Sequence, residues 1–213
     1  MIIPEKFNNI RPFIPEELPR VYERLLVDPQ FLEVLKKVFP THPIERLRQQ
    51  MLSCKTLLEF QKMFIYGIVQ DVMKKSGNGF EMEASRLQPD ANYTFMSNHR
   101  DIVLDSALLD VLLIDNRFKT TCEIAIGDNL LKYPWIKDIV RLNKSFIVLR
   151  NLPLRQMLQA SKTLSEYMHF AINDKQENIW IAQREGRAKD SDDRTAEAVL
   201  KMMTMGGEGT VME

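Results

Sequence analysis

The chain has 213 residues, of which 45% are apolar and 27% charged, a composition typical of a folded globular protein. Lys plus Arg and Asp plus Glu both number 29, so the formal net charge is zero and no overall charge attracts the chain to nucleic acid. Cys54 and Cys122 lie far apart without metal-ligand spacing, and the first residues lack the basic-then-apolar order of a signal peptide. We therefore expect a cytoplasmic protein with both thiols reduced. No run of about 18 apolar residues is present, so we expect that the protein does not span a membrane.

The first part of the chain has the pattern of amphipathic helices interrupted by prolines. Between Lys55 and Lys75, apolar residues recur at steps of three or four and form one stripe. Such a stripe packs against a neighbouring helix or lies in a membrane interface. The sequence SGNG at 76–79 ends the pattern, so we predict an N-terminal helical region over residues 1–78.

From about residue 91, short β-branched or aromatic runs alternate with helical patterns. Strands are predicted at 93–97, 121–126, 145–149 and 178–183, and helices at 101–115, 134–142, 153–173 and 194–203. This alternation predicts an α/β domain over residues 79–213, with a mixed sheet and helices on both of its faces. In such sheets, functional groups collect where strands end and helices begin.

One such point carries the sequence SNHRDIVLDS at 97–106. A protein-kinase catalytic loop does not fit, because no glycine-rich phosphate loop precedes it and no DFG follows. A metal site lacks partners, because His42 and His169 have no companions at ligand spacing, and we expect no metal. A His and Asp pair that deprotonates an alcohol remains, although Asp101 would equally suit a plain helix cap.

Basic residues recur at the ends of the later predicted strands. Lys144 and Arg150 bracket SFIV, and Arg184, Arg187 and Lys189 follow NIWIAQ. Each alone would be an ordinary solvated charge. Because arginine captures a phosphate with two parallel hydrogen bonds, their repetition near His99 favours a phosphate-binding site.

Taken together, these residues resemble the glycerolipid acyltransferase superfamily, which includes the glycerol-3-phosphate and lysophosphatidate acyltransferases. The resemblance lies in four blocks within residues 91–190: NHRDIVLD at 98–105, IGDNL at 126–130 followed by Pro134, KSFIVLR at 144–150, and WIAQREGR at 180–187. No single block identifies the superfamily, but the occurrence of all four blocks in this order is specific for it.

The resemblance implies that His99 is the general base, oriented by Asp105 or by Asp101, and that no acyl-enzyme forms. It implies a substrate-binding set of Arg100, Asn129, Lys144, Arg150, Arg184, Glu185, Gly186, Arg187 and Lys189. The donor would be acyl-CoA or acyl carrier protein, with no further cofactor. The acceptor would be a phosphate-bearing glycerolipid precursor in phospholipid synthesis, and the enzyme would be peripheral on the inner face of the membrane, where its product must go.

Three departures from the family pattern leave alternatives open. Asp105 falls six residues after His99 instead of five, so a longer turn or a substitution by Asp101 is required. The block WIAQREGR has one residue fewer between its Glu and its last Arg than the family pattern, which leaves Arg184 and Arg187 as rival phosphate ligands. A further family block, an apolar strand with a proline, is missing after residue 200, so we expect the domain to be incomplete at its C-terminus. An O-acyltransferase for an amino-acid lipid and an inactive lipid-binding domain are the alternative functions.

Overall fold

The computed structural model describes residues 2–77, 79–150, 152–189 and 194–207. The chain forms two compact units. Unit 1 comprises Met1–Arg11, Glu81–Leu130 and Phe146–Glu213, and unit 2 comprises Pro12–Phe80 and Leu131–Ser145. The predicted division of the chain at residues 78 and 79 stays a prediction.

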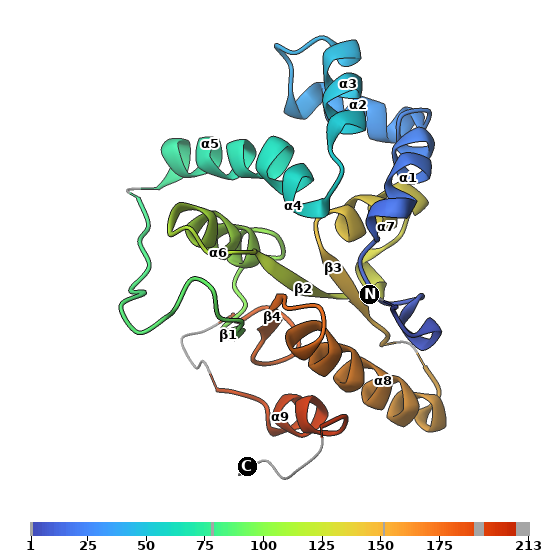
Figure 1. Cartoon of the computed structure of the whole chain (residues 1–213), viewed down its shortest axis with the longest axis vertical. Helices are drawn as coiled ribbons and strands as arrows, with labels where there is room; N and C mark the ends of the chain where they lie inside the picture. Colours follow the sequence, from blue (N-terminus) through green and yellow to red (C-terminus); the bar gives the residue numbers. More distant parts are fainter. Residues whose placement is uncertain (1, 78, 151, 190–193, 208–213) are drawn as a thin grey trace. The chain divides into compact units, whose positions relative to one another are not determined.

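Unit 2 is helical, as predicted for the region before the sheet (Figure 1). Its elements are η2 (Pro15–Glu17), α1 (Leu18–Leu25), α2 (Pro29–Val38), α3 (Ile44–Ser53), α4 (Leu57–Phe60), the π-helical segment η3 (Gln61–Ile65), α5 (Tyr66–Ser76) and α7 (Pro134–Leu142). The Asp28 carboxylate accepts hydrogen bonds from the first amides of α2, which explains why that helix begins at Pro29.

The helix predicted between Lys55 and Lys75 forms as the run α4, η3 and α5. Thr56 and Glu59 make reciprocal capping bonds at its start. Phe60 and Phe64 of the apolar stripe stack with ring centroids 5.1 Å apart, and both belong to the buried core of this unit. For these two residues, the stripe is therefore an internal packing face.

Unit 1 also contains η1 (Glu5–Phe7), η4 (Asp128–Leu130), α6 (Leu104–Asp115), α8 (Leu154–Asn173) and α9 (Glu197–Thr204). The strands of the sheet are β1 (Thr94–Ser97), β2 (Cys122–Gly127), β3 (Ser145–Val148) and β4 (Asn178–Ala182), in the order β1-β4-β2-β3. All four strands were predicted to within two residues at each end, and the α/β class is confirmed.

The sheet is parallel, whereas we expected a mixed one. β4 pairs in parallel with β1, where Ser97 lies opposite Ala182, and with β2, where Ile124 lies opposite Trp180. The reason is the connectivity: a helix lies between each strand and the next, as crossover connections between parallel strands require. The carboxyl ends of β1, β2 and β4 therefore meet at one edge.

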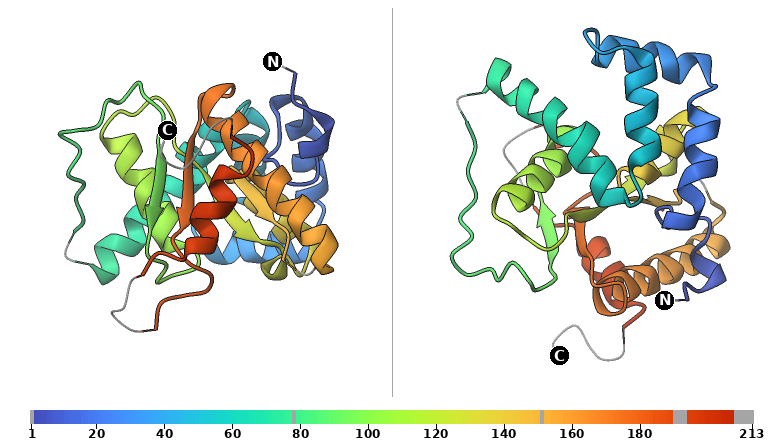
Figure 2. Two further views of the ribbon diagram at one scale, coloured as in Figure 1. Left: turned by 90° about the horizontal axis from the view of Figure 1, so that it is seen from below. Right: turned by 45° about the horizontal axis from the view of Figure 1, so that its top comes forward.

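Helices cover both faces of the sheet in unit 1, as expected (Figures 1 and 2). Because neighbouring residues of a strand point to opposite faces, Ile124 packs with Leu113 of α6, whereas Glu123 accepts a hydrogen bond from Tyr167 of α8. Burial, and after it the charge of Glu123, raises the pKa of the Tyr167 hydroxyl. This hydroxyl therefore stays protonated and acts as the donor.

The predicted helix at 194–203 corresponds to α9, which contacts α8 through hydrogen bonds to the Met203 carbonyl from Ser165 and His169. The proline-containing strand of the family pattern, which we expected to be missing, would follow α9. Residues 208–213 lie outside the described residues. Among the residues that the structure describes, none of the helices combines the length and the apolar character that a membrane span requires.

Candidate active site

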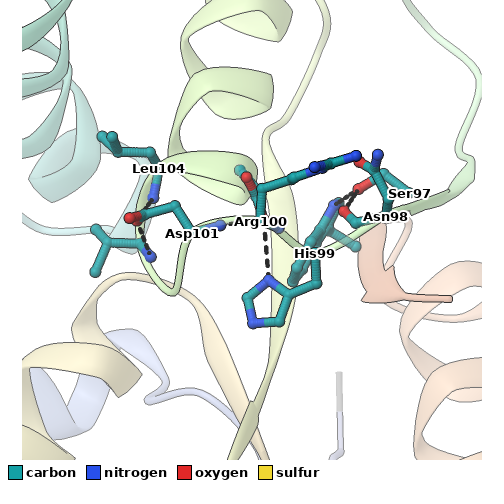
Figure 3. Close-up of polar contacts among 9 residues, drawn as sticks. Ser97, Asn98, His99, Arg100, Asp101 and Leu104 are labelled. Atoms are coloured by element: carbon teal, nitrogen blue, oxygen red, sulfur yellow. Dashed lines mark hydrogen bonds and ion pairs between the residues drawn. The ribbon is translucent and has the colours of Figure 1, made fainter. Parts of the chain in front are cut away.

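The turn between β1 and α6 carries the SNHRDIVLDS motif (Figure 3). The Asp101 carboxylate accepts hydrogen bonds from the backbone amides of Leu104 at 2.8 Å and Val103 at 2.9 Å. These two bonds hold the pKa of Asp101 below its usual range, so the group is charged at neutral pH. Asp101 thus caps the start of α6. The turn that it closes contains the extra residue that separates His99 from Asp105 in comparison with the family pattern. The helix consequently begins at Leu104 instead of the predicted residue 101.

Asp105 is the carboxylate that contacts His99. Its Oδ2 atom lies 2.9 Å from Nδ1 of the imidazole and also accepts from the backbone amides of Arg100 at 2.7 Å and Asp101 at 3.0 Å. In Figure 3 the Asp101 carboxylate is turned toward Leu104 and away from the His99 ring. Of the two candidates that the sequence left open, the structure therefore places Asp105 beside the imidazole.

The His99–Asp105 contact fixes the useful tautomer of the imidazole. An ionised carboxylate is only an acceptor, so Nδ1 carries the hydrogen and Nε2 keeps its lone pair. The ring is further held edge-to-face against Trp180, with centroids 5.9 Å apart. Trp180 in turn donates from Nε1 to the Ser97 hydroxyl at 3.1 Å, and the His99 carbonyl accepts from the Ala188 amide at 2.6 Å. A neutral imidazole held in this way can accept a proton at Nε2.

A pocket of about 220 Å³ opens beside His99, wholly within unit 1. Its lining contains the basic residues Arg150, Arg184 and Arg187, and apolar side chains from the sheet and its loops. The complete lining is His99, Ile102, Ile124, Ala125, Ile126, Gly127, Asn129, Leu130, Arg150, Trp180, Ala182, Arg184, Gly186 and Arg187. The pocket thus brings a potential base, three cations and an apolar wall into one space.

Arg150 is positioned by the loop that follows β2. Its backbone amide donates to the Asp128 carboxylate at 3.2 Å, and its guanidinium donates from Nη1 to Glu185 at 3.0 Å. A β-carbon on Gly127 would lie 2.9 Å from Nε of Arg150 and 2.4 Å from Oδ1 of Asn129. Only glycine at this position lets both side chains lie as they do.

We therefore expect Gly127→Ala to disturb the pocket without unfolding the chain. The atoms that the new methyl group would meet are the ends of flexible side chains, so Asn129 and Arg150 would move aside. If the pocket binds a phosphate-bearing acceptor, as the resemblance implies, the KM for that acceptor should rise by about tenfold or more, since one charged hydrogen bond is worth about 1.5–3 kcal/mol. Steady-state kinetics would measure this. Gly67→Ala is the matched control, because its β-carbon would meet open space. Equal kinetics in both variants would contradict the role of Gly127 in leaving space for Asn129 and Arg150.

The remaining predicted site residues lie as follows. Arg100 and Lys189 are exposed and do not line the pocket, and Lys144 is buried in unit 2 with a left-handed φ of 56°. Glu185 does not line the pocket either but pairs with the lining residue Arg150, and the φ of 75° at Gly186 explains a glycine there. The substrate-binding roles of all these residues stay predictions.

Of the lining residues that were not among the predicted site residues, Trp180 and Gly127 have the clearest structural roles. Trp180 holds the His99 ring, and Gly127 leaves space for Arg150. Both lie within blocks that the sequence analysis singled out, but a tryptophan and a glycine are most often explained by packing and by a turn. Gly127 is the last residue of β2, and this position at a strand end was the signal that could have identified it; Trp180 lies in the middle of β4 and gave no such signal.

Comparison with known families gives the family of the chain. The family model described as Acyltransferase matches residues 80–207, more than half of the chain. The chain belongs to the acyltransferase family. The resemblance to the glycerolipid acyltransferases is thereby confirmed, and the matched range includes every residue that lines the pocket. No curated protein and no solved structure matches this acyltransferase.

Proposed function

We propose that this acyltransferase moves a fatty acyl group from acyl-CoA or acyl carrier protein to a hydroxyl of glycerol 3-phosphate or lysophosphatidate, in phospholipid synthesis. The observation that carries the proposal is the pocket in which the His99–Asp105 pair faces three arginines. A base beside an anion-binding site suits an acceptor that bears both a hydroxyl and a phosphate. The enzyme would work in the cytoplasm, at the surface of the membrane, without nucleic acid or a further cofactor.

His99 would act as the general base at Nε2. As the acceptor oxygen attacks the thioester carbonyl, its proton passes to Nε2, and Asp105 stabilises the resulting imidazolium through Nδ1. A new C–O bond forms and the C–S bond breaks. The thiolate leaves with the proton returned from His99, so the step balances without an acyl-enzyme.

The arginines would hold the phosphate of the acceptor. Arg150, Arg184 and Arg187 all line the pocket, and the guanidinium plane matches phosphate oxygens in a way that an ammonium does not. Arg150 forms an ion pair with Glu185, whose side chain is exposed and can swing away when a phosphate takes its place. Arg184 and Arg187 remain joint candidates, because both line the pocket.

The apolar part of the pocket would receive the reacting end of the acyl donor. Ile102, Ile126 and Leu130 line it together with Trp180. Apolar walls exclude water from the thioester, which limits hydrolysis and strengthens the charge interactions of His99. The fatty acyl group would extend from this region.

The experiment that tests the proposal is thiol release from acyl-CoA and from acyl carrier protein against a panel of acceptors. The panel contains glycerol 3-phosphate, lysophosphatidate, a lysine-derived lipid and glycerol. We expect release that depends on the first two acceptors, with formation of an ester product. Release driven only by the amino-acid lipid would favour the alternative acceptor, and no release with any pair would favour an inactive domain.

A conservative change at Arg150 separates acceptor binding from donor binding. Arg150→Lys keeps the charge but loses the planar pair of donors, so the acceptor KM should rise by about tenfold while the donor KM stays within about twofold. Arg86→Lys, at an exposed position outside the pocket, is the control. Equal increases in both KM values would assign Arg150 a structural role.

A further inference from the structure

A group of apolar side chains is exposed at the start of α8 and just before it. Leu149, Leu154, Met157 and Leu158 are 39%, 83%, 43% and 67% exposed. All four belong to unit 1, and Leu149 is followed directly by the pocket residue Arg150. We call these four residues the α8 surface.

Three members of the α8 surface form one stripe on the helix. Leu154, Met157 and Leu158 are spaced three and four residues apart, so they share a face. Further along α8, Leu164 and Met168 are buried. The first two turns of the helix thus carry apolar side chains as the buried part does, but present them to solvent. Such a stripe gains free energy when it is removed from water.

The charged residues next to the α8 surface in the sequence are basic up to Glu166, which forms ion pairs with Lys6 and Lys162. Residues 146–165 contain Arg150, Arg155 and Lys162 and no Asp or Glu, although the whole chain carries equal numbers of acids and bases. Arg155 and Lys162 are exposed, and Lys162 has only a distant pairing with Glu166 at 3.9 Å. Exposed apolar residues flanked by cations are the composition of a helix that lies on an anionic lipid surface.

We infer that the α8 surface binds an anionic lipid bilayer and brings the mouth of the pocket to it. A second copy of the chain is a poorer occupant, because a symmetric contact would bring the same cations of the two copies together. A bilayer supplies both an apolar layer for the leucines and anionic headgroups for Arg155 and Lys162. The proposed function already places the enzyme at a membrane surface; the inference adds which residues make that contact, and its test needs neither acceptor nor donor.

The test is sedimentation of the full chain with vesicles, without any substrate. We expect binding to vesicles of phosphatidylcholine with phosphatidylglycerol, weaker binding to phosphatidylcholine alone, and a loss of the difference in high salt. The double variant L154S/L158S should bind the anionic vesicles about tenfold less or weaker still. R155Q/K162Q should lose the preference for phosphatidylglycerol but keep the residual binding.

A control variant tests whether the α8 surface in particular binds the vesicles. Val27→Ser removes an apolar residue that is 73% exposed in unit 2, and it should leave vesicle binding unchanged. Circular dichroism checks that each variant folds. The inference is overturned if the wild type does not bind the vesicles, or if L154S/L158S binds them as well as the wild type does. It is also overturned if the variants change the oligomeric state without changing vesicle binding. Because no substrate is present, none of these outcomes depends on the proposed acyl transfer.

Discussion

Replacement of His99 by alanine should lower the rate of acyl transfer by about 100-fold or more while leaving the fold intact. The attacking hydroxyl must lose its proton as the ester bond forms, and the imidazole beside Asp105 is the group in the pocket that can take it. The imidazole is 17% exposed and packs against Trp180, so the folding of the variant is checked alongside its activity.

The appropriate measurement is the initial rate of thiol release at saturating donor and acceptor, with circular dichroism of each variant. His42→Ala is the matched control, because this exposed histidine belongs to unit 2 and contacts only Thr41 and the Phe39 ring in the described structure. It should retain wild-type rates. Near-normal turnover by His99→Ala would end the general-base assignment.

Exchange of Asp105 for asparagine should also lower the rate, by about 100-fold. The amide is uncharged and cannot stabilise an imidazolium, and it allows the tautomer that places the proton on Nε2. Asp101→Asn should have a much smaller effect, because its carboxylate caps α6 through Val103 and Leu104 and does not touch the ring. The two aspartates therefore form a matched pair that separates catalysis from capping.

A double variant sharpens this test. If Asp105 acts through the imidazole, combining Asp105→Asn with His99→Ala should lower the rate little beyond His99→Ala alone, because the two residues work as a unit. Multiplication of the two single effects would show that Asp105 acts elsewhere. A loss of thermal stability with Asp105→Asn is expected to be modest, since the amide oxygen can still accept from the Arg100 amide.

The secondary structure could be predicted well because its signals are local. β4 has an apolar run in which Trp180 stands between two β-branched isoleucines, and α7 has Pro134 at its first turn, so both were predicted with small errors. The direction of strand pairing is not local. It depends on the end of the sheet at which each connection begins the next strand, and the sequence does not show this. A mixed sheet was therefore expected, whereas a parallel one is found.

The site was predictable in its residue types but not in its geometry. His99 and the arginines stand at strand ends, where parallel sheets gather functional groups. The choice between Asp101 and Asp105 depended on how a six-residue turn closes, which spacing alone does not decide. The pairing of Arg150 with Glu185 and the support of His99 by Trp180 join segments far apart in the sequence, so only the fold reveals them.

Acceptors that differ only in their phosphate give the sharpest test of the proposed acyl transfer. Thiol release from acyl-CoA is measured with glycerol 3-phosphate and lysophosphatidate, and with glycerol and monoacylglycerol at the same concentrations. We predict at least about a hundredfold higher kcat/KM for the phosphate-bearing acceptors, and loss of the activity in His99→Ala. Equal rates with and without the phosphate, or activity that persists without His99, would contradict the proposed function.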